Sequence, residues 1–253
     1  MSRTPVLPDD LQAGLKRLKL SAIRREAADI LLTAKTQRWT PEETLRVLVE
    51  LEIAARDESN CRNRMTAARF PVDKTLDGFN LTESSISRAS HDYLITLDWI
   101  SRADNLCLVG PAGTGNSHYL IGLGRAAVEA SYRVRYFSAV ELIEHLWRAV
   151  ADNTVGRAIE TVCHNELIII DEIGFAPLDH TGCQLLFRLI AAAYERRSVA
   201  IASHSPFDQW GRFLPDQPTA VSLLDRLCHH AHIITTTGDS YRLRHRTTGQ
   251  KEA

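Results

Sequence analysis

The sequence has no paired cysteines, no long apolar run and no marked excess of either charge. Its five cysteines are far apart and form no C-x-x-C pair, which excludes a disulfide framework and a zinc ribbon. Cys228-His229-His230-Ala231-His232 contains metal-ligating residue types, but the sequence shows no second group of ligands for it. This stretch alone therefore does not predict a metal site.

Membrane-spanning and secretory segments are also missing from the sequence. No apolar run approaches the roughly 18 residues that cross a bilayer, and the first residues lack the apolar stretch of a signal peptide. We therefore expect a cytoplasmic protein with no membrane partner. The 253 residues, 44% of them hydrophobic, suffice for one large domain or for one domain with a small appendage.

The net charge of −1 is unevenly distributed along the chain. Residues 1–70 have a net charge of +3, residues 71–224 of −6 and residues 225–253 of +2. The basic residues of the N-terminal region fit either DNA contact or a solvated helix face. They are Lys16, Arg17, Lys19, Arg24 and Arg25.

A glycine-rich loop is the most informative stretch of the sequence. Residues 106–117 read Leu-Cys-Leu-Val-Gly-Pro-Ala-Gly-Thr-Gly-Asn-Ser, an apolar strand that leads into a loop, and helical spacing of apolar residues follows. The phosphate-binding pattern G-x-x-x-x-G-K-[ST] is met at Gly110, Gly115 and Ser117, but Asn116 occupies the lysine position. The loop amides and the helix N-terminus can still bind an anion.

The rest of the pattern predicts an α/β core after a helical N-terminal region. Thr40-Pro41-Glu42-Glu43 has the features of a helix start, and residues 72–80 resemble an extended linker, which places a domain boundary near residue 70. Beyond residue 70, helices are expected at 86–101, 118–128, 139–151, 157–164, 179–197, 206–213 and 221–230, and strands at 106–109, 132–137, 166–172, 198–204, 232–236 and 240–244.

Two of these strands end in polar residues. Asp171 and Glu172 follow four consecutive aliphatic residues, as expected for a buried parallel strand whose carboxyl end borders the ligand crevice. In P-loop ATPases such an acid holds the magnesium shell, and a following glutamate can polarise the attacking water. Ser203 and His204 end the next strand, where they either sense a γ-phosphate or simply terminate it.

Six segments in this order resemble the IstB-like helper ATPases of insertion-sequence transposition. They are Ala68-Arg69-Phe70-Pro71, Gly110 to Ser117, Leu167 to Gly174, Ser203 to Phe207 with Trp210, Asp225-Arg226-Leu227 and Gly238 to Arg242. That family belongs to the AAA+ class and is close to the bacterial helicase loaders. The resemblance implies a helical N-terminal domain at 1–70 and an AAA+ domain with a parallel sheet flanked by helices at 71–246. Residues 247–253 are polar and are expected to form a disordered tail.

The resemblance also implies a function and site residues. The chain is expected to bind ATP and Mg²⁺, to assemble as a homo-oligomer on duplex DNA, and to recruit or activate a partner transposase. The residues expected to hold the nucleotide are Gly110, Pro111, Ala112, Gly113, Thr114, Gly115, Asn116, Ser117, His118 and Asp171. Ser117 and Asp171 are expected to serve Mg²⁺, and Glu172 to be the catalytic glutamate.

Further roles follow from position in the family's pattern. Sensor 1, the residue that detects the γ-phosphate, falls at Ser203 or His204. Arg226 is the candidate arginine finger, which would reach the nucleotide site of a neighbouring subunit, and Arg242 is the second choice. The alternative role of Arg226 is an ion pair with Asp225 in the same chain. AAA+ relatives that load onto DNA carry an extra helix where residues 139–164 lie. Arg148 and Arg157 are the basic residues of that segment and are expected to contact phosphates without sequence preference.

The departure at Asn116 leaves three functional hypotheses. A lost charge-assisted contact costs about 1.5–3 kcal/mol, or roughly ten- to a hundredfold in binding. Hydrolysis should suffer more, because the lysine charge also counters the transition state. The chain is thus an ATPase with impaired turnover, a DNA-binding scaffold that binds nucleotide poorly, or a helicase loader, which the N-terminal helices disfavour.

Overall fold

The computed structural model describes residues 6–241. The chain divides into two compact units, Met1–Asn63 and Arg64–Ala253, and the division falls inside a helix, upstream of the boundary expected near residue 70. The tail expected at 247–253 lies outside the described residues, as does Arg242. Of the strand expected at 240–244, Ser240 and Tyr241 are described and do not form a strand.

The first unit is helical, as the apolar spacing predicts. It contains α1 (Asp9–Arg17), α2 (Ser21–Gln37) and most of α3 (Pro41–Ala68). The predicted start of α3 is confirmed, because the Thr40 amide donates to Glu43 Oε2 at 2.7 Å and the Glu43 amide donates to Thr40 Oγ1 at 3.2 Å. These reciprocal bonds satisfy amides that have no partner within the helix.

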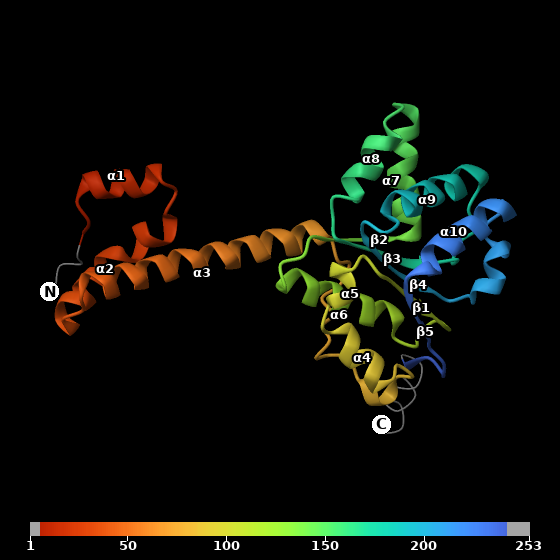
Figure 1. The fold of residues 1–253 in the computed structure, drawn as a ribbon, viewed down its shortest axis with the longest axis horizontal. Helices are drawn as coiled ribbons and strands as arrows, with labels where there is room; N and C mark the ends of the chain where they lie inside the picture. The colour runs from red at the N-terminus through yellow and green to blue at the C-terminus, as the bar shows by residue number, and fades with distance from the viewer. Residues whose placement is uncertain (1–5, 242–253) are drawn as a thin grey trace, which may run out of the picture. The chain divides into compact units, whose positions relative to one another are not determined.

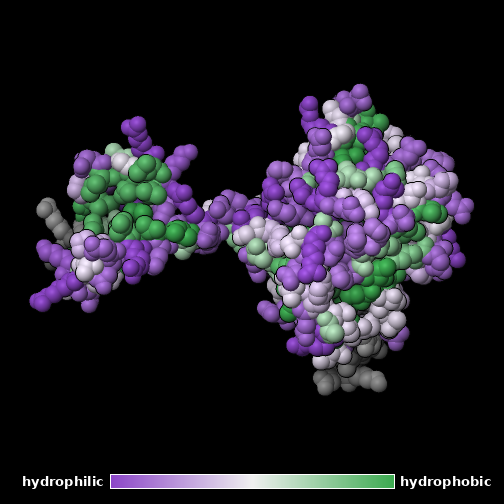
Figure 2. Space-filling model, in the orientation of Figure 1, coloured by the Kyte–Doolittle hydropathy of each residue, from purple (hydrophilic) through white to green (hydrophobic). Residues whose placement is uncertain are grey.

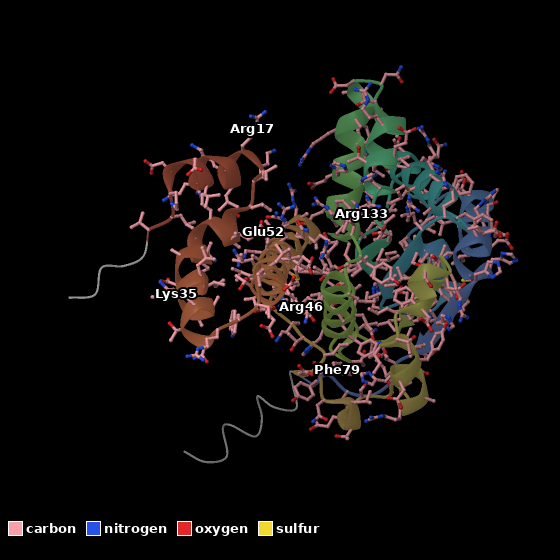
Figure 3. The ribbon with its side chains drawn as sticks, turned by 60° about the vertical axis from the view of Figure 1, so that its left-hand side comes forward. Arg17, Lys35, Arg46, Glu52, Phe79 and Arg133 are labelled. Atoms are coloured by element: carbon pink, nitrogen blue, oxygen red, sulfur yellow. The ribbon has the colours of Figure 1, made fainter. Side chains whose placement is uncertain are left out.

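A buried carboxylate joins α3 to α2 (Figure 3). Glu52 Oε2 accepts hydrogen bonds from the amides of Ala22 and Ile23 at 2.9 and 3.1 Å, and Oε1 accepts one from Arg56 at 3.0 Å. Leu20, the N-cap residue of α2, has no side-chain acceptor for the free amides of this helix, so Glu52 from α3 accepts their hydrogen bonds instead. Burial alone raises the pKa of Glu52, but the amides and Arg56 outweigh burial and hold this pKa below its usual value.

The second unit is built on a parallel sheet. Its described strands have the order β2-β3-β4-β1-β5, and every neighbouring pair is parallel. The strands are β1 (Asn105–Val109), β2 (Val134–Ser138), β3 (Leu167–Ile173), β4 (Ser198–Ser203) and β5 (Ala231–Thr235). The predicted α/β class is therefore confirmed, and β1, β3 and β4 are the buried runs that the sequence indicates.

Helices cover both faces of this sheet (Figure 1). One face packs against α7, α8, α9 and α10, whose apolar residues form the main core with the strands, and the other face carries α4, α5 and α6. The bounds are η1 (Leu81–Glu83), α4 (Arg88–Leu94), α5 (Asp98–Ser101), α6 (Asn116–Glu129), α7 (Ala139–Ala151), α8 (Val155–Val162), α9 (His180–Ala193), η2 (Phe207–Arg212) and α10 (Gln217–His229).

Three of the expected helices differ from the structure by more than two residues at an end or in continuity. The helix expected at 86–101 is two helices, because Leu97 adopts a left-handed conformation with φ +61°. The helix expected at 179–197 ends at Ala193, before Glu195 with φ +54°. The helix expected from residue 221 begins at Gln217, because Asp216 caps it and accepts from the Thr219 amide.

Candidate nucleotide site

The glycine loop joins β1 to α6, and its backbone requires glycine. Gly113 and Gly115 have φ +90° and +97°, a region that side chains disfavour, and Gly115 is the N-cap of α6. Gly110 has no room for a side chain, because a Cβ there would overlap the carbonyl and hydroxyl oxygens of Thr236. The loop therefore packs directly on the chain that leaves β5.

Asn116 is bound into this contact. Its side chain is only 9% exposed, and its Oδ1 accepts a hydrogen bond from Thr236 Oγ1 at 2.9 Å. Thr236 Oγ1 also lies 3.0 Å from Thr114 Oγ1, which donates to the Pro111 carbonyl at 2.8 Å. The residue in the lysine position thus ties the first turn of α6 to the end of β5.

The linker at residues 72–80 packs on the loop and on α6. Phe79 lies against Gly115, where an added Cβ would be 2.8 Å from Phe79 Cε2, and its ring centroid is 5.0 Å from that of Tyr119. His118 Nε2 is 2.9 Å from the Thr75 carbonyl oxygen, so this expected nucleotide residue faces the linker. Ser117, in contrast, is exposed. The sequence pattern gave no sign that Phe79 (Figure 3) reaches the loop.

Asp171 is buried near the carboxyl end of β3. It is 2% exposed, its Oδ2 accepts from the Tyr136 hydroxyl at 2.8 Å, and its Oδ1 accepts from the Glu172 amide at 2.8 Å. Burial, and then the nearby Asp171 carboxylate, raise the pKa of Tyr136, so the phenol remains a hydrogen-bond donor. Tyr136 comes from the neighbouring strand β2, and its role depends on a strand pairing that the sequence does not specify.

Glu172 is exposed and has a strained backbone. Its φ of +60° coincides with an irregularity in the β3–β4 pairing between Ile170 and Ile173. A left-handed conformation costs a non-glycine residue roughly 1–2 kcal/mol. Such strain is common where a functional side chain must be presented, and here it turns the Glu172 carboxylate away from the buried interior.

The two sensor candidates have different surroundings. The Ser203 hydroxyl is engaged locally, because it donates to the Ser205 carbonyl at 2.9 Å and accepts from the Ser205 amide at 3.2 Å. His204 is exposed, and its ring makes an edge contact with Phe175, with centroids 6.0 Å apart. Of the two, His204 is exposed and Ser203 is buried.

Ser203 is also the point at which the two halves of the site meet. Its carbonyl oxygen accepts a hydrogen bond from the Gly110 amide at 2.9 Å, and Ser203 is paired in register with Ile173. Strand β4 thus holds the glycine loop on one side and the end of β3, with Asp171 and Glu172, on the other. The structure brings these predicted residues to one edge of the sheet.

Among the described residues, the candidate arginine finger contacts its own helix α10 and the neighbouring helix α9. Arg226 Nη1 donates to the Ser222 carbonyl at 3.1 Å, and its guanidinium lies 5.0 Å from the centroid of the Phe187 ring. These contacts do not include Asp225, its expected alternative partner, nor the glycine loop.

The expected DNA-contacting residues lie on two surfaces. Arg148 and Arg157 are exposed on α7 and α8, and Arg148 lies 3.5 Å from Glu144. The basic residues of the first unit are exposed as well, and they are Lys16, Arg17, Lys19, Arg24 and Arg25. None of the helices in the described part of the chain is both long and apolar enough to span a membrane.

The first unit also exposes an apolar groove between α2 and α3. The groove has a volume of about 610 Å³, and Figure 2 shows apolar side chains gathered on this unit. Lys35 and Arg38 are the charged residues that line it. Its other lining residues are Leu31, Ala34, Trp39, Pro41, Thr44, Leu45 and Leu48. No sequence motif marks this groove.

Known proteins and structures resemble the chain over most of its length. The sequence pattern of the IstB-like ATP binding protein family matches residues 13–249. The ATP-binding protein of insertion sequence IS21 from Pseudomonas aeruginosa is 32% identical over 236 residues, which cover 93% of this chain and 89% of that protein. The corresponding protein of insertion sequence IS5376 from Geobacillus stearothermophilus is 31% identical over 229 residues, which cover 90% and 91%.

Solved structures agree on the fold. AMPPCP-bound DnaA from Aquifex aeolicus matches with a TM-score of 0.52 at 18% identity, over 70% of this chain and 55% of the DnaA chain. The match spans about half of that longer chain and shows a shared fold, to which the parallel sheet β2-β3-β4-β1-β5 belongs. The family match along nearly the whole sequence, together with the identity to the IS21 protein, establishes that the chain belongs to the IstB-like ATP-binding proteins of insertion sequences.

Proposed function

We propose that this chain is an ATPase that assembles on duplex DNA in an ATP-dependent way and there recruits or activates a partner transposase. The observation that carries the proposal is the meeting at Ser203, where β4 joins the glycine loop to the strand end with Asp171 and Glu172. An anion-binding loop beside one buried and one exposed acid is the arrangement that phosphoryl transfer from a nucleotide needs. We place this activity in the cytoplasm.

The residues present fit a magnesium nucleotide. The exposed Ser117 hydroxyl and the Asp171 carboxylate offer the oxygen ligands that Mg²⁺ prefers, and the ion would offset negative charge on the phosphates. Tyr136 fixes the Asp171 carboxylate by its hydrogen bond. Glu172 is free to orient a water molecule, and His204 to sense the terminal phosphate. The contacts of Arg226 with Ser222 and Phe187 do not involve the glycine loop of its own chain, and we assign it to the nucleotide site of a neighbouring subunit.

Tyr136→Phe tests the support of Asp171. The variant leaves one oxygen of a buried carboxylate without its donor, so Mg²⁺-dependent nucleotide binding should weaken about tenfold, as for other lost partners of metal ligands. The free energy of unfolding should fall by about 1–3 kcal/mol. Titration of a fluorescent ATP analogue with and without Mg²⁺ measures the effect. Equal weakening in both titrations would show that Tyr136 serves the fold and not the ion.

DNA-dependent assembly is tested with the purified full chain. We expect it to shift duplex DNA of unrelated sequences at low salt, more strongly with ATP, and to form species larger than a dimer on the DNA in gel filtration. Protein that stayed monomeric and unbound under these conditions would disprove the assembly.

Arg148→Gln/Arg157→Gln tests the DNA contact of α7 and α8. Each lost phosphate contact should reduce the slope of log K against log salt by about one. The matched control is Arg88→Gln/Arg102→Gln, which removes the same charge from α4 and from the C-cap of α5 on the other side of the sheet. If both double variants lose affinity equally, net charge and not this helix pair governs binding.

The surface of the first unit supports contact with a protein partner. An exposed apolar groove lined by two cations fits an amphipathic acidic segment better than a phosphate backbone, whereas the separate basic residues fit DNA. We assign the groove to the transposase and the basic residues to DNA.

One observation favours a second candidate, a DNA-binding scaffold of the same fold with little ATP turnover. Asn116 supplies no charge to the phosphates, and its amide is already engaged by Thr236. The two candidates differ in turnover and not in fold, so the turnover of the unmodified chain, compared with that of the Asn116→Lys variant, separates them.

A further inference from the structure

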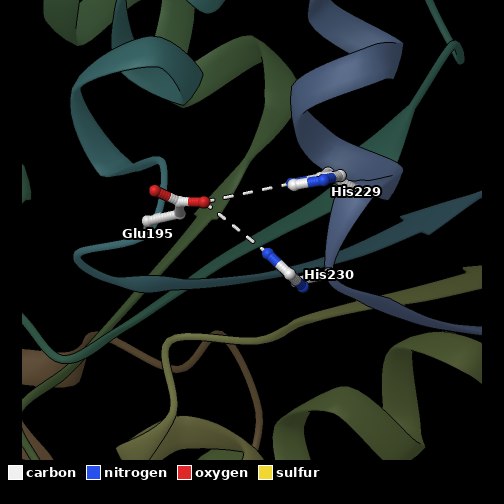
Figure 4. A group of neighbouring side chains, drawn as sticks. All are labelled: Glu195, His229 and His230. Atoms are coloured by element: carbon white, nitrogen blue, oxygen red, sulfur yellow. Dashed lines mark ion pairs between the residues drawn. The ribbon is translucent and has the colours of Figure 1, made fainter.

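Three metal-ligating side chains meet where α9 and α10 end (Figure 4). Glu195 follows α9, His229 is the last residue of α10, and His230 is its C-cap. Glu195 Oε1 lies 3.6 Å from His230 Nε2 and 4.0 Å from His229 Nδ1, and all three ligand atoms lie within 4.8 Å of one another. We propose that these residues bind a divalent first-row metal ion, of which Zn²⁺ is the best match.

The end of α10 explains how two neighbouring histidines reach one point. In a continuing helix, consecutive side chains diverge by about 100°. Here the helix stops at His229, and His230 takes φ −123° and ψ 65°, which brings the two ring centroids to 4.1 Å. The sequence around Cys228 shows no further ligand for these histidines, because the third ligand, Glu195, lies in another part of the chain.

The distances suit zinc after small side-chain rotations. Ligand atoms about 2.1 Å from a tetrahedral Zn²⁺ are about 3.4 Å apart. The separations of 3.6 and 4.0 Å from Glu195 exceed this value, and the third pair of ligand atoms lies within 4.8 Å. The three side chains are 52–56% exposed, so they can rotate to close these gaps. Three protein ligands leave the fourth position to water.

Tyr194 competes with the metal for one of these ligands. Its hydroxyl lies 2.7 Å from His229 Nδ1, the nitrogen that faces Glu195, and the two rings stack with centroids 5.8 Å apart. The hydroxyl must release this nitrogen when a metal binds. Removing it should therefore leave zinc binding intact or make it tighter.

The electrostatics of the two helix ends favour a cation. Both α9 and α10 end at the site, and a helix C-terminus has a partial negative charge. Two of the three nearby arginines are engaged elsewhere, because Arg197 donates to the Cys163 carbonyl and Arg226 to the Ser222 carbonyl, whereas Arg196 is exposed beside Glu195. Two imidazoles and one carboxylate select zinc-like ions over Mg²⁺ and Ca²⁺, which prefer oxygen ligands.

The site has a structural consequence that is independent of ATP hydrolysis. A bound ion fastens the end of α10 to the end of α9, one turn beyond Arg226. Because the ligands come from separate parts of the chain, the ion binds the folded state and raises its stability.

Zinc binding to the full chain, measured by isothermal titration and by thermal unfolding, tests the inference. We expect one Zn²⁺ per chain, a higher melting temperature with zinc, and at least tenfold weaker binding in Glu195→Gln and in His230→Gln. His180→Gln, at the opposite end of α9, is the matched control and should bind as the unmodified chain does. Tyr194→Phe should bind at least as tightly.

Two results would overturn the site. The first is an unmodified chain that takes up no stoichiometric zinc. The second is equal affinity in Glu195→Gln, His230→Gln and the His180→Gln control, which would place the zinc at other side chains such as the free cysteines. Unfolding of each variant without zinc separates a lost ligand from a damaged fold, because a lost ligand leaves the zinc-free melting temperature unchanged.

Discussion

The Asn116→Lys variant should bind ATP ten- to a hundredfold more tightly than the unmodified chain and should hydrolyse it faster by a larger factor. The gain in binding corresponds to one charge-assisted contact, about 1.5–3 kcal/mol, because an ammonium replaces a neutral amide beside the β- and γ-phosphates. The gain in rate is larger because the same charge also counters the charge that develops in the transition state.

The surroundings of Asn116 determine what else this substitution changes. Its amide accepts from Thr236, and a lysine loses that hydrogen bond, at a cost of about 1 kcal/mol. Thr236 keeps its contact with Thr114, and Gly110 still packs on Thr236, so the loop retains its contact with the end of β5. We therefore expect a slightly less stable protein with a more competent site.

Calorimetric ATP binding and phosphate release measure these two effects. Asn116→Gln is the matched control, since it lengthens the side chain without adding charge and should gain nothing. Adding Glu172→Gln to the lysine variant should abolish turnover and leave binding intact. If Asn116→Lys alters neither binding nor turnover, the phosphates do not lie at this loop.

The sequence predicts the parts of this site that depend on local chemistry. Strands β3 and β4 are buried on both faces and therefore appear as apolar runs, and the glycine loop has a pattern set by its backbone. The start of α7 was also predictable, because Ser138 and Glu141 cap it reciprocally within four consecutive residues.

The contacts that complete the site could not be predicted in this way. Tyr136 reaches Asp171, and Thr236 reaches Asn116, only because β2 and β5 lie where the strand order places them. The packing of Phe79 on Gly115 depends on the path of a linker without regular structure. Nor does any local signal mark Leu97, whose left-handed backbone splits the helix expected at 86–101.

Trp210→Ala should lower the free energy of unfolding of the second unit by about 3–5 kcal/mol. Trp210 is fully buried, with the rings of Phe207 and Phe213 each 5.3 Å away between centroids. Truncation leaves a cavity in the main core that stiff neighbouring rings cannot fill. It also removes the indole donor that lies 3.2 Å from the Ser205 carbonyl.

The same substitution should reach the nucleotide site. Ser205 holds the Ser203 hydroxyl, and Ser203 in turn binds the Gly110 amide, while Phe213 packs on Gly174 just beyond Glu172. Loss of the Trp210 side chain thus weakens the support of the glycine loop, through Ser203, and of the chain beyond Glu172, through Phe213. Nucleotide affinity should therefore fall together with stability.

Urea unfolding followed by circular dichroism, with ATP binding measured on the folded fraction, checks the Trp210 prediction. Trp210→Phe retains most of the ring packing and should cost less than half as much as the alanine variant. Trp147→Ala, at a site that is 45% exposed on α7, should change the free energy of unfolding by less than about 0.5 kcal/mol. Equal losses at Trp210 and Trp147 would mean that the aromatic cluster does not anchor this edge of the sheet, and that the Ser203 contact is held by the strands alone.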